Sequence, residues 1–142
     1  MPDNNVCIVK RYFECEQQVA DAIRDNTLTK ELCKQFLQVS DCMFVHTEKV
    51  NPLARAAVRH RLAYMCIEEG DEESGIRLLE DMIEEVVKTT QKFGHEADWD
   101  EYLIKVSEEL CEIFQQKEDT ERIKIYSDVI DWAKAAADKK HK

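Results

Sequence analysis

The stretch from Asn51 to Gly94 constrains the fold of this 142-residue chain most, because it contains start and stop signals for two consecutive helices. The first helix is expected to open at Asn51, an N-cap residue, with Pro52 in its first turn. Gly70 tolerates the left-handed conformation that ends many helices, and Asp71 can cap the helix that follows. The stretch therefore predicts a helical hairpin with a tight turn.

Two further helices are predicted before this hairpin. Apolar residues recur at helical spacing from about Asn4 to Asp25 and again up to about Thr47. Thr27 or Thr29 is placed to cap the second of these helices. The N-terminal part of the chain is thus expected to form a second hairpin.

A third hairpin is predicted after Gly94. Asp98 and Glu101 resemble a capping box in which an acid replaces the usual Ser or Thr, so Asp98 is expected to start the fifth helix. Asp119 is expected to cap the sixth. The proposed starts at Asn4, Asn51 and Asp98 are 47 residues apart, which suggests an internal structural repeat.

The composition agrees with long helices and short connections, since the chain holds only 3 Gly and 2 Pro. The sequence therefore predicts an all-α fold of six helices in three antiparallel hairpins. It predicts one helical domain over residues 1–138 and a frayed basic tail over residues 139–142.

Residues of the central hairpin resemble the tetratricopeptide repeat, with a large–small pair in the first helix, a turn glycine and small and large residues alternating in the second. The residues that carry this resemblance are Leu62, Ala63, Gly70, Gly75, Leu79 and Met82. It covers about residues 59–88, and the last hairpin is a weak second copy. The resemblance implies a right-handed stack of hairpins and a close approach of the two helices at Ala63 and Gly75. The alternative is an ordinary compact helical bundle.

A stack of this kind binds a peptide or a partner's helix in a groove that is lined by the first helix of each pair. The predicted partner-binding residues are Arg55, Arg59, His60, Arg61 and Tyr64 of the third helix, with Tyr102 of the fifth. Guanidinium groups match carboxylates, and aromatic residues dominate many interfaces. Alternatively, the arginines pair with acids such as Glu80 or Glu84, and Tyr64, Tyr102 and Trp132 are partly buried core residues.

Charge and cysteine content restrict the partners and the compartment. The net charge is −10, and residues 67–142 hold 22 acidic and 11 basic residues, so nucleic acid and acidic membranes are not expected as partners. The 6 cysteines form no C-x-x-C pair and are interpreted as reduced core residues of a cytoplasmic or nuclear protein. Neither a signal peptide nor a membrane span is expected.

No motif predicts chemistry: the chain lacks the patterns of di-iron, zinc-protease, calcium and phosphate-binding sites. No catalytic residue, metal site or cofactor is therefore predicted, and the favoured function is a non-catalytic protein–protein interaction module, an adaptor or scaffold. The alternative is a structural subunit that forms a homodimer or larger assembly through apolar helix faces. The residues that broaden those faces are Ile8, Tyr12, Phe44, Ile125 and Trp132.

Overall fold

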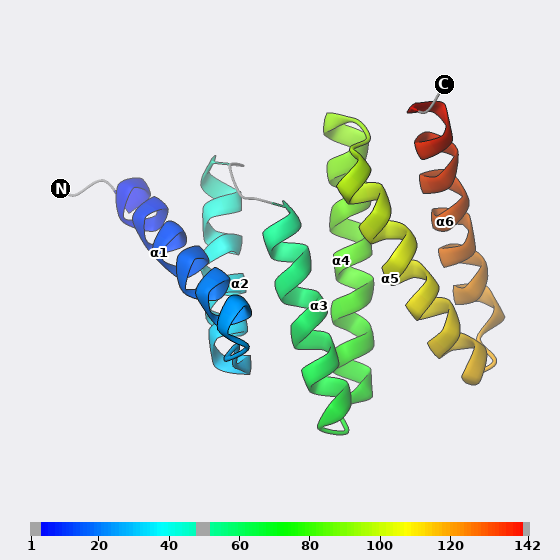
Figure 1. The fold of residues 1–142 in the computed structure, drawn as a ribbon, viewed down its shortest axis with the longest axis horizontal. Helices are drawn as coiled ribbons and strands as arrows, with labels where there is room; N and C mark the ends of the chain where they lie inside the picture. Colours follow the sequence, from blue (N-terminus) through cyan, green and yellow to red (C-terminus); the bar gives the residue numbers. More distant parts are fainter. Residues whose placement is uncertain (1–3, 48–51, 141–142) are drawn as a thin grey trace. The chain divides into compact units, whose positions relative to one another are not determined.

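The computed structural model describes residues 4–47 and 52–140, and in those ranges it contains six α-helices and no β-strand (Figure 1). The helices are α1 (Asn4–Asp25), α2 (Lys30–Thr47), α3 (Pro52–Glu68), α4 (Glu72–Phe93), α5 (Ala97–Gln116) and α6 (Thr120–Lys140). The predicted all-α class is confirmed.

The chain divides into an N-terminal unit, Met1–Leu78, and a C-terminal unit, Leu79–Lys142, with the boundary inside α4. The single domain over residues 1–138 stays a prediction. Helix α6 continues to Lys140, so the first residues of the tail expected to fray belong to the helix, while residues 141–142 lie outside the described residues.

The core of the N-terminal unit forms where α2 packs against both α1 and α3. Each helix contributes apolar residues at helical spacing, so one face of each is turned inward. The buried cluster comprises Tyr12, Cys15, Val19, Cys33, Phe36, Val39, Met43, Val58, Leu62 and Cys66.

Tyr12 corrects one expectation about apolar faces. The sequence assigned it to a face that is broader than the packing needs, but it is fully buried in this core, 5.7 Å from Phe36 between ring centroids. The side chains of Ile8 and Phe44, which were assigned to the same kind of face, lie outside the described part of the structure.

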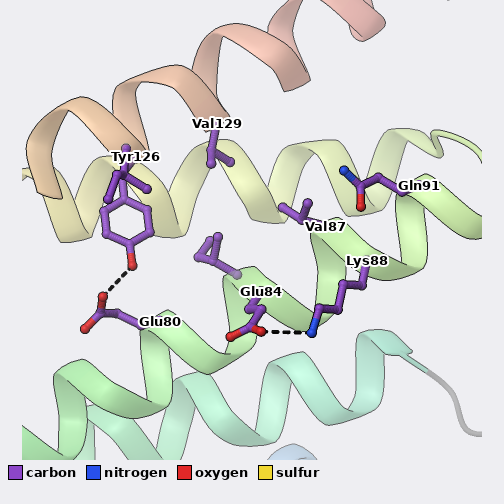
Figure 2. A pocket seen from close by; sticks show the side chains of 9 residues that line it. Glu80, Glu84, Val87, Lys88, Gln91, Tyr126 and Val129 are labelled. Atoms are coloured by element: carbon purple, nitrogen blue, oxygen red, sulfur yellow. Dashed lines mark hydrogen bonds and ion pairs between the residues drawn. The ribbon is translucent and has the colours of Figure 1, made fainter.

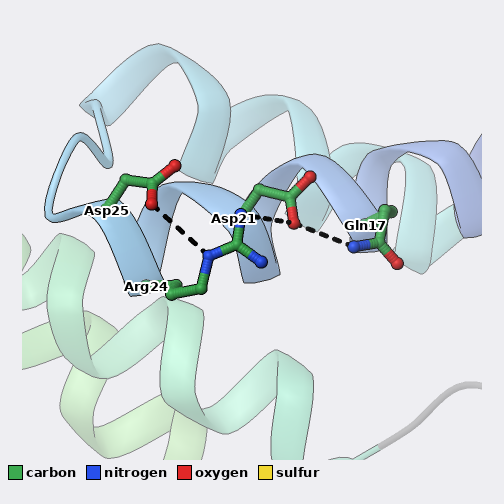
Figure 3. A network of polar contacts seen from close by, with 4 residues as sticks. All are labelled: Gln17, Asp21, Arg24 and Asp25. Carbon is green, nitrogen blue, oxygen red and sulfur yellow. Dashed lines mark hydrogen bonds and ion pairs between the residues drawn. The ribbon is translucent and has the colours of Figure 1, made fainter.

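Helix α1 ends in an exposed polar network along its own surface (Figure 3). Gln17 Nε2 donates a hydrogen bond of 2.9 Å to Asp21 Oδ1, and Arg24 lies 3.4 Å from both Asp21 and Asp25. A cation in the last turn also complements the partial negative charge of a helix C-terminus. The network therefore stabilises the end of the helix.

The turn between α1 and α2 follows the predicted signals. Asn26 adopts a left-handed conformation with φ of 57°. Asparagine tolerates this conformation better than most residues. Of the two candidate caps, Thr29 has the role, because its Oγ1 accepts a hydrogen bond of 3.2 Å from the backbone N–H of Leu32.

The turn between α3 and α4 also has the predicted geometry. Gly70 has φ of 92°, and Asp71 Oδ1 accepts a hydrogen bond of 3.3 Å from the backbone N–H of Ser74. At the other end of α4, Gly94 has φ of 95° and terminates the helix. The predicted cap of α3, Asn51, lies outside the described residues.

Gly75 brings the first turn of α4 against α3. A Cβ atom at this position would lie 2.7 Å from the carbonyl oxygen of Ala63 and 2.6 Å from Cγ1 of Ile67. Only glycine fits without a shift of backbone. The predicted close approach of the two helices at Ala63 and Gly75 is confirmed.

The C-terminal unit is built around the α5–α6 hairpin and the part of α4 that follows Leu78. The residues that α4, α5 and α6 bury include Ile83, Val86, Leu103, Val106, Leu110, Phe114, Tyr126 and Ala133. Between α5 and α6, Asp119 acts as the predicted cap, since its Oδ1 accepts a hydrogen bond of 3.2 Å from the backbone N–H of Arg122.

The predicted start of α5 at Asp98 is wrong. The helix begins at Ala97, and its N-cap residue is Glu96, whose side chain makes no capping hydrogen bond. The reason lies in Asp100, whose carboxylate is buried and lies 2.8 Å from Nδ1 of His95. This pair joins the residue before the N-cap to the fourth helical residue, where a hydrophobic staple often fixes the chain direction.

Candidate functional site

A groove on the C-terminal unit lies between α4 and α6 and has a volume of about 360 Å³ (Figure 2). Its lining from α4 is Glu80, Ile83, Glu84, Val87, Lys88 and Gln91, and its lining from α6 is Ile125, Tyr126 and Val129. The α4 residues recur every three or four positions, so they form one continuous stripe along the helix.

The middle of the groove is apolar and open to solvent. Ile83 is buried, and Val87 and Val129 are half-buried. Ile125 is 54% exposed, which makes it one of three large hydrophobic residues with high exposure in the part of the chain that the structure describes. An apolar groove with polar residues at its edges has the form that receives apolar side chains of a helix in helix-in-groove recognition.

One end of the groove is held by a charged hydrogen bond. The Tyr126 hydroxyl donates to Glu80 Oε2 at 2.6 Å (Figure 2). Arg122 Nε lies 3.9 Å from the same oxygen. The ring of Phe114 stacks on Tyr126 with centroids 6.0 Å apart, and it lies 5.1 Å from the guanidinium carbon of Arg122. Burial first, and then the Glu80 carboxylate, raises the pKa of the Tyr126 phenol, so the hydroxyl remains a donor at neutral pH.

The other end of the groove is more open. Lys88 Nζ lies 2.9 Å from Glu84 Oε1, and both side chains are mostly exposed. An exposed pair of this kind contributes only ~0–1 kcal/mol to stability, so a partner's charges could replace it at little cost.

One predicted partner-binding residue, Arg55, is buried in the N-terminal unit. Arg55 is 3% exposed, and its guanidinium group lies 2.6 Å from Asp41 and donates a hydrogen bond of 2.6 Å to Ser40 Oγ. Arg55 is therefore not part of an accessible basic cluster. The carboxylate partner Asp41 belongs to α2, and the predicted pairing of the arginines with acids of α4 stays a prediction.

The other predicted residues are partly or fully accessible. Arg59, His60 and Tyr64 of α3 are half-buried, and Arg61 is exposed. The rings of His60 and Tyr64 meet edge to face with centroids 5.1 Å apart. Tyr102 is half-buried on α5, in the other unit. Their role in partner binding stays a prediction.

A second polar cluster lies at the start of α5. Asp100 is 2% exposed, and one of its oxygens, Oδ2, has no hydrogen-bond partner among the described residues. His95, which contacts the other oxygen, also lies against Trp132 of α6 with ring centroids 4.5 Å apart. These contacts tie the α4–α5 connection to α6 and thus support the helices that form the groove.

The described cysteines are free thiols with different environments. Cys15, Cys33 and Cys66 are buried, which confirms the interpretation as core residues for these three, whereas Cys42 is exposed. Burial raises the pKa of the Cys33 thiol to about 11 and also raises the pKa of Cys15. The thiols of Cys15 and Cys33 are thus poor nucleophiles.

Comparison of the chain with family models, curated proteins and solved structures finds no match. Within the described ranges, no cluster of three or more His, Cys, Asp or Glu residues is placed to hold a metal ion. None of the helices, as far as they are described, is long and apolar enough to cross a membrane.

Sequence reasoning placed the binding surface on α3 and missed the groove between α4 and α6. The sequence predicts α4 and α6 in different hairpins, so it does not show that they line one groove. The available signal was the excess of apolar residues on α6, including Ile125, which the alternative of self-association used.

Proposed function

We propose that the protein is a non-catalytic interaction module that holds an amphipathic helix of a partner protein in the α4–α6 groove. The observation that carries the proposal is the exposed side chain of Ile125, which lies with Val129 and Val87 along an apolar groove with a charged rim. Burial of such a surface is the main favourable term in protein association.

A helix is the occupant that the dimensions favour. The α4 lining extends from Glu80 to Gln91. This span corresponds to about 16 Å at a rise of about 1.5 Å per residue. Three turns of a partner helix have this length, and their apolar residues at i, i+3 or i+4 and i+7 would contact the floor of the groove.

The remaining parts of the proposal follow from the sequence. We propose a cytoplasmic or nuclear location, which free thiols suit, and no cofactor or chemistry of the protein's own. We also propose tetratricopeptide-like stacking of the hairpins. A second contact surface would then comprise Arg59, His60, Arg61, Tyr64 and Tyr102.

The test compares two substitutions at equally exposed apolar residues. Ile125→Glu changes the groove, whereas Phe13→Glu changes α1, where Phe13 is 55% exposed. Full-length wild-type and variant chains are used to capture partners from cell extract, and the captured proteins are quantified by mass spectrometry. We expect a set of partners that Ile125→Glu loses and Phe13→Glu retains. Equal capture by all three chains would show that the groove is not the binding site.

Self-association is the second candidate function, and the exposed aromatic residues favour it. Phe93 is 65% exposed and Phe13 is 55% exposed. Light scattering over a range of concentrations distinguishes this function: a constant monomer mass excludes it, while a dimer that dissociates on Phe93→Glu supports it.

A further inference from the structure

Each of the two helices that line the groove carries an exposed acidic residue next to a lining residue. On α4, Asp81 is exposed and lies next to Glu80, and its negative charge contributes to the raised pKa of Tyr126 across the groove. On α6, Asp128 is exposed and lies three residues after Ile125 and one before Val129, on the solvent side of the lining. Both helices of the groove thus present a carboxylate to solvent beside the lining.

Two cations at the groove, Lys88 and Arg122, already lie beside other acids. Lys88 pairs with Glu84, and Arg122 lies 3.9 Å from both Glu80 and Asp119. Asp81 and Asp128 have no ion pair among the side chains that the structure describes. A basic partner would therefore meet two carboxylates without having to displace a cation.

The net charge of the whole C-terminal unit is also negative. Residues 79–142 contain 17 acidic and 10 basic residues, a net charge of −7, whereas residues 1–78 contain 13 and 10, a net charge of −3. A symmetric dimer through this groove would place the same acidic walls opposite one another. Complementary charge instead favours a positively charged occupant and accelerates its association.

We infer that the groove's occupant is a basic amphipathic helix from another protein, with Lys or Arg residues on both sides of its apolar stripe. This inference rests on the proposed function and specifies its partner. The apolar stripe contacts Val87, Ile125 and Val129, and the flanking cations reach Asp81 and Asp128.

Three synthetic 14-residue peptides test the charge of the occupant against the full-length chain. All carry leucines at the same helical positions, and their polar positions are all lysine, all serine or all glutamate. Fluorescence anisotropy measures the affinity of each peptide. We expect the lysine peptide to bind about tenfold or more tightly than the glutamate peptide, with a difference that shrinks at high salt.

Two double variants with the same change in net charge test whether the preference for the lysine peptide arises at the groove. Asp81→Lys with Asp128→Lys reverses the charge of both groove walls. Glu101→Lys with Glu112→Lys changes two exposed residues of α5, which contributes no residue to the lining given above. We expect the first pair to weaken binding of the lysine peptide about tenfold and the second pair to change it less than about threefold.

The outcomes separate the inference from the proposed function. If Ile125→Glu abolishes binding but the serine or glutamate peptide binds as tightly as the lysine peptide, the groove is a docking site and the inference of a basic partner is wrong. If the lysine peptide does not bind saturably, or binds equally to Ile125→Glu, both the inference and the groove are wrong. A concentration-dependent dimer that Ile125→Glu dissociates would show that a second copy is the occupant.

Discussion

Helices α2 and α6 carry similar apolar patterns but bury them to different extents. Helix α2 has 18 residues and buries Cys33, Phe36, Val39, Ser40 and Met43. Helix α6 has 21 residues and, among its described side chains, buries only Tyr126 and Ala133. Helix α2 packs against α1 and α3, whereas α6 packs against α5 and leaves a groove towards α4. A helical period thus predicts an apolar face, and only the neighbouring helices decide whether that face becomes core or docking surface.

Polar residues show the same contrast. In the N-terminal unit, Arg55 is buried, and its guanidinium group forms an ion pair with Asp41 and a hydrogen bond to Ser40. In the C-terminal unit, Tyr126 and Glu80 form their hydrogen bond at the edge of an open groove. The first arrangement fixes the packing of α2 against α3, and the second shapes a surface that another molecule can reach.

The largest expected effect is at the centre of the α2 interface. Phe36 is fully buried and Phe13 is mostly exposed, so the two phenylalanines form a matched pair. Phe36→Ala should lower the free energy of unfolding, measured by urea denaturation with circular dichroism, by about 3–5 kcal/mol. Phe13→Ala should stay within about 0.5 kcal/mol of wild type. Equal effects of the two substitutions would mean that α2 is not the packed helix described here.

A smaller effect is expected where α3 and α4 meet. Gly75→Ala places a methyl group against the Ala63 carbonyl oxygen. The overpacking cost of ~1–3 kcal/mol should exceed the ~1 kcal/mol gained in helix propensity. We expect a net destabilisation of about 1–2 kcal/mol in urea denaturation. The exposed neighbour Glu73→Ala should have little effect. A stabilised Gly75→Ala variant would contradict the close approach of the two helices.

The fold was largely predictable from the sequence because its signals are local. Asp71, Asp119 and Thr29 act as caps through their own side chains, and Gly70 and Gly94 adopt the left-handed conformations that their positions require. Each of these features depends on a few consecutive residues, which the sequence displays directly.

The errors came from side chains whose partners the local sequence pattern does not identify. The exposed-cluster prediction for Arg55 failed because Asp41 of α2 pairs with it. The predicted cap at Asp98 failed because Asp100 turns inward to His95. The groove was missed for the same reason, since α4 and α6 meet only in three dimensions. Local pattern gives the helices, but it does not give the pairs between them.

The hydrogen bond between Tyr126 and Glu80 should contribute less to the free energy of unfolding than the packing of Phe36 on α2. Tyr126→Phe removes it, and we expect a loss of about 1 kcal/mol at neutral pH. The pKa of Tyr126 is raised in the folded state, so this contribution is complete below the ordinary tyrosine pKa of 10.0 and is lost as the pH rises above it. Urea denaturation at about pH 8 and about pH 11 should therefore show the difference between wild type and Tyr126→Phe shrinking at the higher pH. A difference that grows with pH would contradict the assignment.

The smallest effect on stability is expected at the residue most important for the proposed function. More than half of the Ile125 side chain already contacts solvent, whereas Val39 on α2 is buried. Ile125→Ser should therefore change the free energy of unfolding by less than about 0.5 kcal/mol. Val39→Ser removes a buried side chain of similar type and should cost roughly 2 kcal/mol or more in the same measurement.

Equal destabilisation by Ile125→Ser and Val39→Ser would make Ile125 a core residue, and α6 would then bury its apolar face as α2 does. A neutral Ile125→Ser would instead separate folding from binding at this position, because any partner lost on substitution of Ile125 would then be lost from a folded protein.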